Sequence, residues 1–343
     1  MKTFIKVLPV FQGDAFLLFF NNREACIMID SGTRRGYSKG VLKNELKRLK
    51  SVDLLVLTHA DEDHIGGILK YYEDKERIPK LFKNVWFNSG SVISKELGLA
   101  EGEDIDLYES SNLAISIKQG RTLEQELKKE EILFRRAIKA QDTYHLYFAE
   151  INVLSPDIGD LRNLLTKWEV ESEKQLEVTS INDFDKRIGE LSKLRFVEKG
   201  TLANKASIAV FIETDSARML FLGDAFPTVV EKNIRKFGYN EYRKLKLDIV
   251  KISHHGSNAA TSPDLLKIID CTRFIISTNG GNNLPSKECL SRIITHRKDK
   301  ITLYFNYENE VTGGIFSGDE MKEHNFEVIY LNPGNNFTIS VGE

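Results

Sequence analysis

The sequence predicts an α/β fold in which two β-sheets pack face to face, with helices on their outer sides. Apolar strands alternate with segments of helical periodicity over much of the chain, which is the pattern of an α/β domain. Both halves also share one order: a hairpin that ends in an acidic residue, a helix, and a buried strand that ends in histidine. The chain has 343 residues, of which 41% are hydrophobic and 29% charged, so it can bury such a core as a single domain, residues 1–343.

The first 90 residues supply the elements of the first half. Short apolar runs separated by polar turns predict three strands, at residues 4–10, 15–20 and 25–29. Leu42, Leu46 and Leu49 share one face of a predicted helix over residues 38–50. A continuous apolar strand is predicted at 52–58, followed by a helix at 64–72 and a strand at 83–87.

Two long segments differ from this pattern and are predicted to be helical insertions, residues 91–145 and 157–203. Residues 101–109 are acidic, and residues 119–140 and 161–194 are rich in Lys, Glu and Leu at helical spacing. A strand at residues 146–154 separates the insertions. The second half then continues with strands at 207–213, 218–222, 247–252 and 273–277, helices at 229–237, 262–270 and 286–296, and a tail, 301–342, that is mostly strands.

Composition limits the class of protein. Cys26, Cys271 and Cys289 are too widely spaced for a disulfide framework or a thiolate metal site, so we expect a reducing compartment, the cytoplasm. Neither a signal peptide nor an apolar run of membrane-spanning length is predicted, so no membrane association is expected. The net charge of −2 gives no general attraction to nucleic acid. The basic stretches at 34–35, 43–50 and 243–251 could form a local groove or could be solvated helix surface.

The densest cluster of reactive side chains is His59-Ala60-Asp61-Glu62-Asp63-His64, directly after the strand at 52–58. That strand delivers two imidazoles and three carboxylates to its carboxyl end, the edge where α/β sheets carry their sites. Donors held this closely are costly to bury unless a cation neutralises them. Gly66 and Gly67 let the next helix start tightly. The alternative, an acidic helix start capped by Asp61 or Asp63, would make both histidines incidental; we therefore predict a metal centre.

Three further strand ends carry candidate residues. The strand at 247–252 leads into Ser253-His254-His255-Gly256, where adjacent histidines beside glycine indicate one metal ligand and one neighbour that orients it. Asp224 follows the strand at 218–222 and a glycine, and Asp30 follows the strand at 25–29. Each aspartate alone is ambiguous.

Taken in order, Asp30, the cluster at 59–64, Asp224 and the His254-His255 pair resemble the motifs of the metallo-β-lactamase superfamily. More narrowly, the sequence is similar to the ComEC-type metallo-hydrolases, the nuclease-like domain attached to DNA-uptake channels. Four stretches favour this subgroup: Gln12-Gly13-Asp14-Ala15, Leu154-Ser155-Pro156, Asn204-Lys205-Ala206-Ser207 and His255-Gly256-Ser257. The resemblance covers residues 3–90, 146–157 and 204–280 and includes no membrane channel. It implies an αββα metallo-β-lactamase sandwich with the two helical insertions.

Two departures from the superfamily pattern bear on the metal. Position 61 is Asp rather than His, as is common in the ComEC-like branch. The usual third histidine, expected shortly before Asp224, is absent, because that window holds Lys199, Gly200, Thr201 and Asn204. His145 is a distant candidate to replace it. Oxygen-rich ligation favours harder ions, which makes Mn²⁺ at least as suitable as Zn²⁺.

The resemblance implies two divalent metal ions, Zn²⁺ or Mn²⁺. We assign His59 and Asp61 to one ion, and Asp63, His64 and either His254 or His255 to the other, with Asp224 between them. Asp30 would orient a ligand or the attacking water. A metal-bound water or the histidine that binds no metal could protonate the leaving group. The candidate catalytic residues are thus Asp63, His255 and Asp30. The candidate substrate-binding residues are Asn204, Ser207 and Ser257.

The predicted activity is that of a metallo-hydrolase. Two divalent ions lower the pKa of a shared water and stabilise the oxygens of a displacement at phosphorus. We therefore expect a phosphodiesterase or nuclease that acts on DNA or RNA through a metal-activated hydroxide. One alternative is a small-molecule phosphodiesterase for a cyclic nucleotide or a headgroup. Another is a metal-bound sensor or scaffold subunit of a multi-protein system, such as an antiviral defence system, whose protein partner binds the helical insertions.

Overall fold

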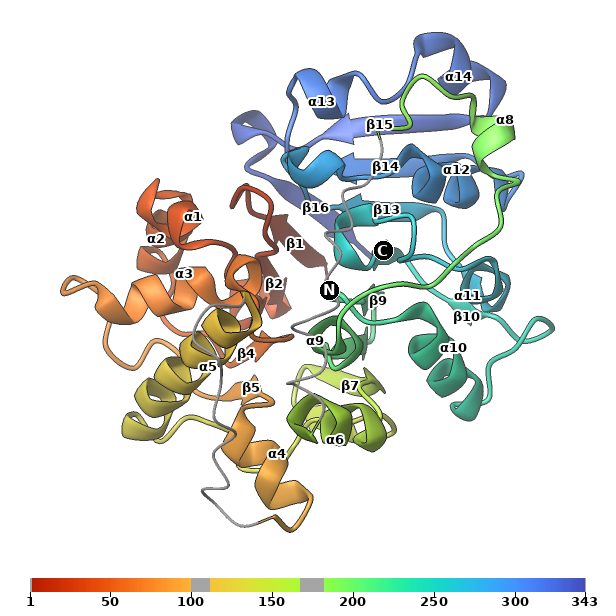
Figure 1. The fold of residues 1–343 in the computed structure, drawn as a ribbon. Coiled ribbons are helices and arrows are strands. Elements are labelled where there is room, and N and C mark those ends of the chain that lie inside the picture. The colour runs from red at the N-terminus through yellow and green to blue at the C-terminus, as the bar shows by residue number, and fades with distance from the viewer. Residues whose placement is uncertain (1, 100–111, 167–181, 343) are drawn as a thin grey trace.

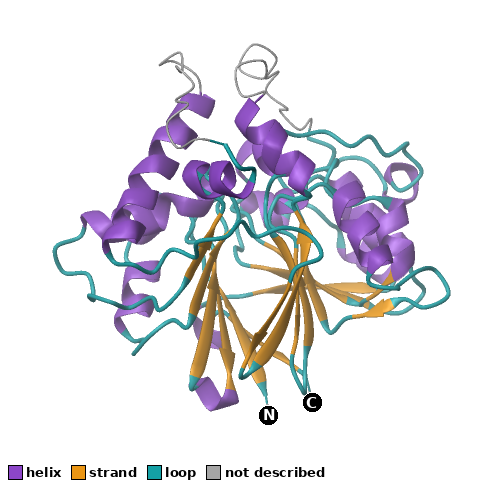
Figure 2. Ribbon diagram, turned by 90° about the horizontal axis from the view of Figure 1, so that it is seen from below, coloured by secondary structure: helices purple, strands orange, loops and turns teal. Residues whose placement is uncertain are grey.

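The structure is a computed structural model that describes residues 2–99, 112–166 and 182–342. The predicted acidic stretch at 101–109 and residues 167–181 of the second predicted insertion lie outside the described residues. Within the described parts, most strands belong to two large sheets, and helices lie on the outer sides of these sheets (Figures 1 and 2).

The first sheet has six strands in the order β16-β1-β2-β3-β4-β5. Its strands are β16 (Thr338–Val341), β1 (Thr3–Val7), β2 (Phe16–Phe20), β3 (Ala25–Ile29), β4 (Leu54–Leu57) and β5 (Val85–Phe87). Neighbours from β16 to β3 are antiparallel, whereas β3, β4 and β5 run parallel. The last strand of the chain therefore completes the N-terminal sheet, and β3 and β4 end at the same edge.

The second sheet has eight strands in the order β15-β14-β13-β11-β9-β8-β7-β6. Its strands are β15 (Phe326–Tyr330), β14 (Ile301–Phe305), β13 (Arg273–Ile276), β11 (Ile249–Lys251), β9 (Arg218–Phe221), β8 (Ala209–Glu213), β7 (Ala149–Ser155) and β6 (Thr143–Leu146). Strands β15 to β9 run parallel, so β9 and β11 also end at a common edge. A separate short pair joins β10 (Leu245–Lys246) and β12 (Ile269–Asp270).

The two sheets pack against each other through an apolar layer. Val7 and Phe16 of the first sheet and Phe221 and Ile249 of the second belong to one buried cluster, and each is at most 1% exposed. The rings of Phe16 and Phe221 meet edge to face, with centroids 5.4 Å apart. Because burial of each large apolar side chain contributes roughly 1.5–3 kcal/mol, this layer holds the sheets face to face.

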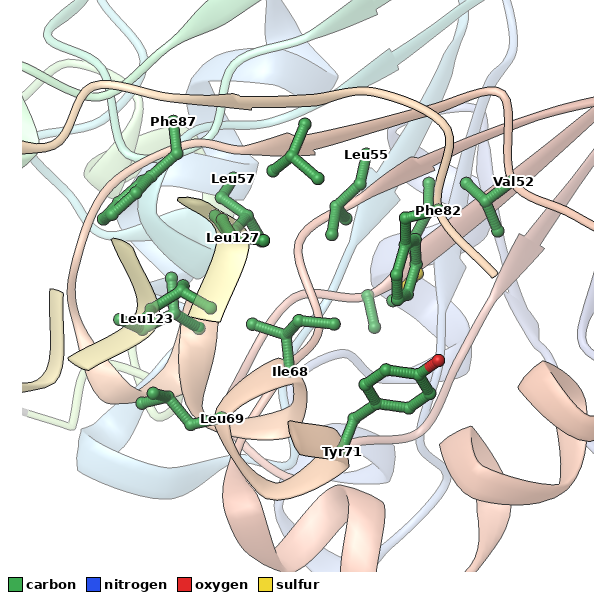
Figure 3. Packing of buried hydrophobic residues seen from close by; sticks show 14 of the residues in the cluster. Val52, Leu55, Leu57, Ile68, Leu69, Tyr71, Phe82, Phe87, Leu123 and Leu127 are labelled. Carbon is green, nitrogen blue, oxygen red and sulfur yellow. The ribbon is translucent and has the colours of Figure 1, made fainter. Parts of the chain in front are cut away.

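Helices α1 (Arg34–Ser38), α2 (Val41–Lys47), α3 (Glu62–Glu73) and α5 (Asn112–Lys129) cover the outer side of the first sheet. Leu123 and Leu127 of α5 are fully buried in the same cluster as Leu57 and Leu69, and Figure 3 shows these side chains together. Helix α5 lies within the first predicted insertion, yet it forms part of the hydrophobic core.

The outer side of the second sheet packs mainly against α8 (Ile188–Leu191), α10 (Pro227–Lys236), α11 (Pro263–Ile268) and α12 (Lys287–Thr295). The remaining described α-helices are α4 (Gly90–Glu96), α6 (Ile158–Thr166), α9 (Leu202–Lys205), α13 (Glu310–Gly313) and α14 (Gly318–Glu323). The described chain thus has four layers: helices, sheet, sheet and helices.

Three elements differ from the sequence prediction. The helix expected at 38–50 is the shorter helix α2, which begins after the left-handed Gly40 (φ 92°), and a separate helix, α1, precedes it. Helix α3 begins at Glu62 rather than at 64, so His64 lies in its first turn and Gly67 lies inside the helix. The tail contains α13 and α14 beside its strands, and each begins with a capping box, at Asn309 and Ser317.

None of the described helices has the length and apolar character needed to cross a membrane. Cys26, Cys271 and Cys289 are free and buried, and burial raises the pKa of each thiol.

Candidate metal centre

The first group of candidate ligands lies at the carboxyl end of β4, where the chain enters α3. Asp61 is the N-cap residue of α3, but its side chain accepts no hydrogen bond from the helix backbone. Its Oδ1 instead accepts a hydrogen bond of 3.0 Å from the hydroxyl of Ser116 in α5, and its Oδ2 lies 3.4 Å from His59 Nε2. The carboxylate of Asp61 therefore faces His59 and does not cap the helix.

Asp30 follows β3 and holds His64 in one orientation. Its backbone is left-handed (φ 54°), and its carboxylate accepts hydrogen bonds of 2.8 Å from both the backbone N–H and the hydroxyl of Thr58. Asp30 Oδ2 also lies 2.8 Å from His64 Nδ1. When Nδ1 donates to this carboxylate, the lone pair of the neutral ring is on Nε2. These contacts suit the orienting role that the sequence predicts for Asp30.

The second sheet supplies Asp224 after β9 and the two adjacent histidines after β11. His254, His255 and Gly256 all have left-handed backbones, with φ of 45°, 52° and 82°. Strained conformations of this kind persist where the surroundings fix them and are concentrated at functional sites. His255 Nδ1 lies 2.9 Å from the carbonyl oxygen of Ser277, so donation to that carbonyl directs Nε2 of His255 to the other side of the ring.

Asp224 lies between two sets of imidazoles. Its Oδ1 is 3.5 Å from His64 Nε2, whereas its Oδ2 is 3.8 Å from His59 Nε2 and 3.8 Å from His254 Nε2. The side chain of Asp224 is 4% exposed. The two oxygens of this buried carboxylate therefore face different imidazoles; the bridging role that the sequence predicts for Asp224 stays a prediction.

Asp63 completes the second set of donors. Its Oδ2 lies 3.3 Å from His255 Nε2, and its Oδ1 lies 3.9 Å from His64 Nε2. Asp63, His64 and His255 form one cluster with metal-ligand spacing, and His59, His64 and Asp224 form another. His255, with 4% of its side chain exposed, joins the Asp63–His64 set, whereas His254, at 34%, lies nearer the surface.

The donor atoms fit divalent cations. His59 Nε2, His64 Nε2, His255 Nε2 and Asp224 Oδ1 are buried and have no hydrogen-bond partner in the described part of the chain. A buried polar atom without a partner costs roughly 1–3 kcal/mol. Since these four atoms converge from both sheets, coordination of a cation is the simplest way to satisfy them.

Without a cation, protonated histidines supply the positive charge at this centre. Burial disfavours a charged His64 ring, but the carboxylates of Asp224, Asp30 and Asp63 outweigh burial and raise its pKa well above 6.5. Burial likewise opposes charge on His255, but Asp14 and Asp63 raise its pKa to about 10. Burial would raise the pKa of Asp63, yet His64 and His255 lower it to about 2. The centre therefore carries an excess of negative groups that calls for positive charge.

His254 behaves differently from His255. Burial lowers the pKa of His254 more than the nearby carboxylate of Asp224 raises it, so the neutral ring is favoured near pH 7. A neutral ring can bind a cation or accept a proton, but it is poorly suited to donate one to a leaving group.

The three predicted substrate-binding residues are buried. Asn204 donates a hydrogen bond of 2.9 Å to Asp224 Oδ2, and Ser207 Oγ accepts one of 3.1 Å from the backbone N–H of Asp224. Ser257 Oγ accepts from the backbone N–H of Ala259 at 3.3 Å. Asn204, in the window that lacks the usual histidine, thus holds Asp224 in place. Substrate binding by Asn204, Ser207 and Ser257 stays a prediction.

His145 does not supply the missing donor. It lies in β6, its side chain is 74% exposed, and its Nδ1 is 3.3 Å from Glu150. The edge strand β6 holds it apart from the residues gathered around Asp224.

Sequence reasoning did not assign three residues that the structure places at the centre. Asp14 and Lys251 form an ion pair and are 0% and 1% exposed. The third is Ser116, which binds Asp61. A lysine at the end of an otherwise apolar strand, and an aspartate in the turn after β1, were the available signals for the first two. The contact of Ser116 depends on the tertiary path of α5 and has no local signal.

Residues 8–75 match the family model described as "Metallo-beta-lactamase superfamily". The chain is also 22% identical over 341 residues to ComE operon protein 3 of Bacillus subtilis (strain 168), a match that covers 91% of this chain and 34% of that protein. The chain spans about a third of the length of this curated relative.

Similar solved structures include the metallo-beta-lactamase fold protein YhfI from Bacillus subtilis, with 10% identity, a TM-score of 0.45 and 99% of both chains covered. A diphosphatase from the PhnP family shows 10% identity and a TM-score of 0.42, with 100% of this chain and 99% of that chain covered.

The family match covers the strands and turns that carry Asp30 and the cluster at 59–64. Residues 8–75 are thus similar to the metallo-β-lactamase superfamily, and the structure places histidine and aspartate clusters with metal-ligand spacing at the ends of these strands. Over most of its length the chain is also similar to ComE operon protein 3.

Proposed function

We propose that the chain is a phosphodiesterase that cleaves nucleic acid at a centre for two divalent cations. The observation that carries this proposal is the position of Asp224, whose two carboxylate oxygens face different sets of imidazoles at 3.5–3.8 Å. Sites with two cations stabilise both the attacking and the leaving oxygen of an in-line displacement at phosphorus. When bound, the cations would supply an activated water and positive charge at the phosphate.

The chain's own residues would divide the work as follows. His59, Asp61 and Asp224 would hold one cation, and Asp63, His64, His255 and Asp224 the other. Asp30 would keep His64 Nε2 directed at the centre through its contact with Nδ1. His254, the more exposed histidine, would contact the first cation or accept a proton during the reaction.

The local charge supports two cations rather than one. When ionised, the five carboxylates at the centre carry five negative charges, and the ammonium group of Lys251 balances one of them. Two divalent cations would neutralise the remaining four. The carboxylates are those of Asp14, Asp30, Asp61, Asp63 and Asp224. This oxygen-rich set suits Mn²⁺ as well as Zn²⁺.

Nucleic acid is the proposed substrate because the sequence resembles the ComEC-type metallo-hydrolases in its motifs around Asp14, Ser207 and Ser257. The net charge of −2 implies that binding would depend on local contacts rather than on the overall field of the protein. A small phosphodiester is the competing substrate class.

The proposal is tested by assaying the purified chain with Mn²⁺ or Zn²⁺ against single- and double-stranded DNA, RNA and bis-p-nitrophenyl phosphate. We expect metal-dependent cleavage of a polymer, and a loss of roughly two orders of magnitude or more in the Asp63→Ala, His64→Ala double variant. His145→Ala is the matched control, because it removes an exposed histidine outside the centre. Cleavage of the small ester alone would show that the substrate is a small phosphodiester and not nucleic acid. A complete lack of metal-dependent turnover would refute the proposed activity.

A further inference from the structure

A buried ion pair, Asp14 and Lys251, lies behind the metal centre, and neither residue is among those assigned to hold a cation. Asp14, in the turn between β1 and β2, is 0% exposed, and Lys251, the last residue of β11, is 1% exposed. Their side chains are in direct contact. Burying two charges costs several kcal/mol per ion before their attraction is counted, so a pair of apolar side chains would stabilise the fold at least as well.

The contacts of the pair lead to the ligands. Asp14 Oδ1 lies 3.4 Å from His255 Nδ1, on the side of the ring away from the centre. The backbone N–H of Asp14 donates a hydrogen bond of 3.1 Å to the carbonyl oxygen of Asp63. Lys251 Nζ donates one of 3.1 Å to the carbonyl oxygen of Gly223, the residue before Asp224. The pair thus contacts the side chain of His255, the backbone of Asp63 and the residue that precedes Asp224.

Close packing leaves this turn little freedom. A Cβ atom on Gly13 would lie 2.1 Å from the carbonyl oxygen of Asp63, so only glycine lets the turn approach Asp63 closely enough for the Asp14 contact. The backbone N–H of Gly32 also donates to the carbonyl oxygen of Asp14 at 2.7 Å. These contacts hold Asp14 against the segments that follow β3 and β4 of the first sheet.

We propose that Asp14 and Lys251 are a positioning pair for the metal ligand His255. Asp14 and the Ser277 carbonyl together bind the Nδ1 side of the imidazole, which keeps Nε2 directed at Asp63 and His64. Lys251 holds Asp14 in place and offsets its charge. The inference rests on the proposed metal centre but not on the identity of the substrate.

The test measures metal binding directly, by competition with a chromophoric chelator for Zn²⁺ and by the visible absorption of the Co²⁺-loaded chain. Asp14→Asn should lower the Zn²⁺ affinity of the site formed by Asp63, His64 and His255 about 10–100-fold. This is the usual effect of removing a group that orients a metal ligand. It should also change the Co²⁺ spectrum, because His255 is no longer held.

Lys6→Met is the matched control. Lys6 and Glu45 form another buried pair, 2.6 Å apart and 5% and 11% exposed, and neither residue has a contact with the centre among those described. This variant should lower the stability of the fold and leave Zn²⁺ affinity and the Co²⁺ spectrum unchanged.

The double variant Asp14→Asn, Lys251→Met separates positioning from stability, because it removes both charges and leaves no unpaired ion. Its free energy of unfolding should exceed that of either single variant, while its Zn²⁺ affinity stays low. Wild-type affinity and an unchanged Co²⁺ spectrum in the double variant would show that the pair is merely structural and overturn the inference. If the wild-type chain binds neither Zn²⁺ nor Co²⁺, the metal centre itself is refuted; metal binding without phosphodiester cleavage would leave the positioning pair standing.

Discussion

At the scale of single residues, the least expected contact is the one between Ser116 and Asp61. The hydroxyl that orients Asp61 comes from α5, a helix in a segment that the sequence marks as an insertion. The His59 side of the centre lacks the usual third histidine, so Asp61 and its orientation matter more there than in a site with three imidazoles.

Replacement of Ser116 by alanine should therefore weaken the second, weaker metal-binding step by roughly 10-fold and leave the first step unchanged. Calorimetric titration with Mn²⁺ resolves the two steps. Thr122→Ala is a control in the same helix, since the Thr122 hydroxyl is exposed and donates only to the Lys118 carbonyl among the described contacts. Equal loss of affinity in both variants would mean that α5, and not the Asp61 contact, is responsible.

At the scale of elements, the sequence predicts the strands that carry ligands better than it predicts the helices around them. The strands leading to Asp30, His59, Asp224 and His254 are continuous apolar runs, and each was expected within a few residues of its observed bounds. Burial on both faces produces such a signal locally. Helix limits are less regular: α2 begins after the left-handed Gly40, and α3 begins at Glu62 although the Asp61 side chain forms no cap.

The pairing of ligands across the two sheets could be predicted only in part. The order of motifs pointed to Asp224 as the shared ligand, but choosing between His254 and His255 required the backbone path. Their left-handed conformations direct His255 toward Asp63 and leave His254 nearer the surface. Such dihedral angles follow from tertiary contacts and leave no trace in residue spacing.

Gly67 shows how an element positions the centre. A Cβ atom at this position would lie 2.0 Å from the carbonyl oxygen of Ser31. The backbone N–H and the hydroxyl of Ser31 both donate hydrogen bonds of 2.8 Å to the carbonyl oxygen of His64. Gly67→Ala should therefore destabilise the fold by about 1–3 kcal/mol, despite the better helix propensity of alanine. It should also reduce Zn²⁺ affinity, because α3 must move away from Asp30.

Urea unfolding and chelator competition measure these two effects. Gly159→Ala in α6 is the control, since a Cβ atom there meets no atom within 4 Å, and we expect it to be neutral or slightly stabilising. Unchanged stability of Gly67→Ala would mean that the close approach of α3 to Ser31 is not required.

At the scale of the whole molecule, the centre joins the two sheets. The first sheet contributes His59, Asp63 and His64, and the second contributes Asp224 and His255. A cation that binds only the folded chain raises the free energy of unfolding. The increase is about 2.7 kcal/mol when the cation concentration is 100 times Kd. Chelation should therefore lower Tm, and addition of Zn²⁺ should restore it.

Protons compete with the cations for the same nitrogen atoms. This competition determines whether metal affinity rises or falls with pH. In the metal-free chain the pKa of His64 lies well above 6.5 and that of His255 is about 10, so both rings are protonated near pH 7. A cation binds only the deprotonated rings. Asp63, with a pKa of about 2, is already ionised and releases no proton. Zn²⁺ affinity should therefore rise from about pH 6 to about pH 8, by up to about tenfold per pH unit for each proton released.

Titration calorimetry in two buffers of different ionisation enthalpy counts the released protons directly. We expect about two protons at saturation near pH 7, one from each of these rings. His145→Ala should release the same number, since that ring lies outside the centre. Binding without proton release would mean that His64 and His255 are neutral before the cation arrives, and that the carboxylates around them are balanced in some other way. The opposite slope, with affinity falling as the pH rises, would contradict ligation by these two histidines altogether.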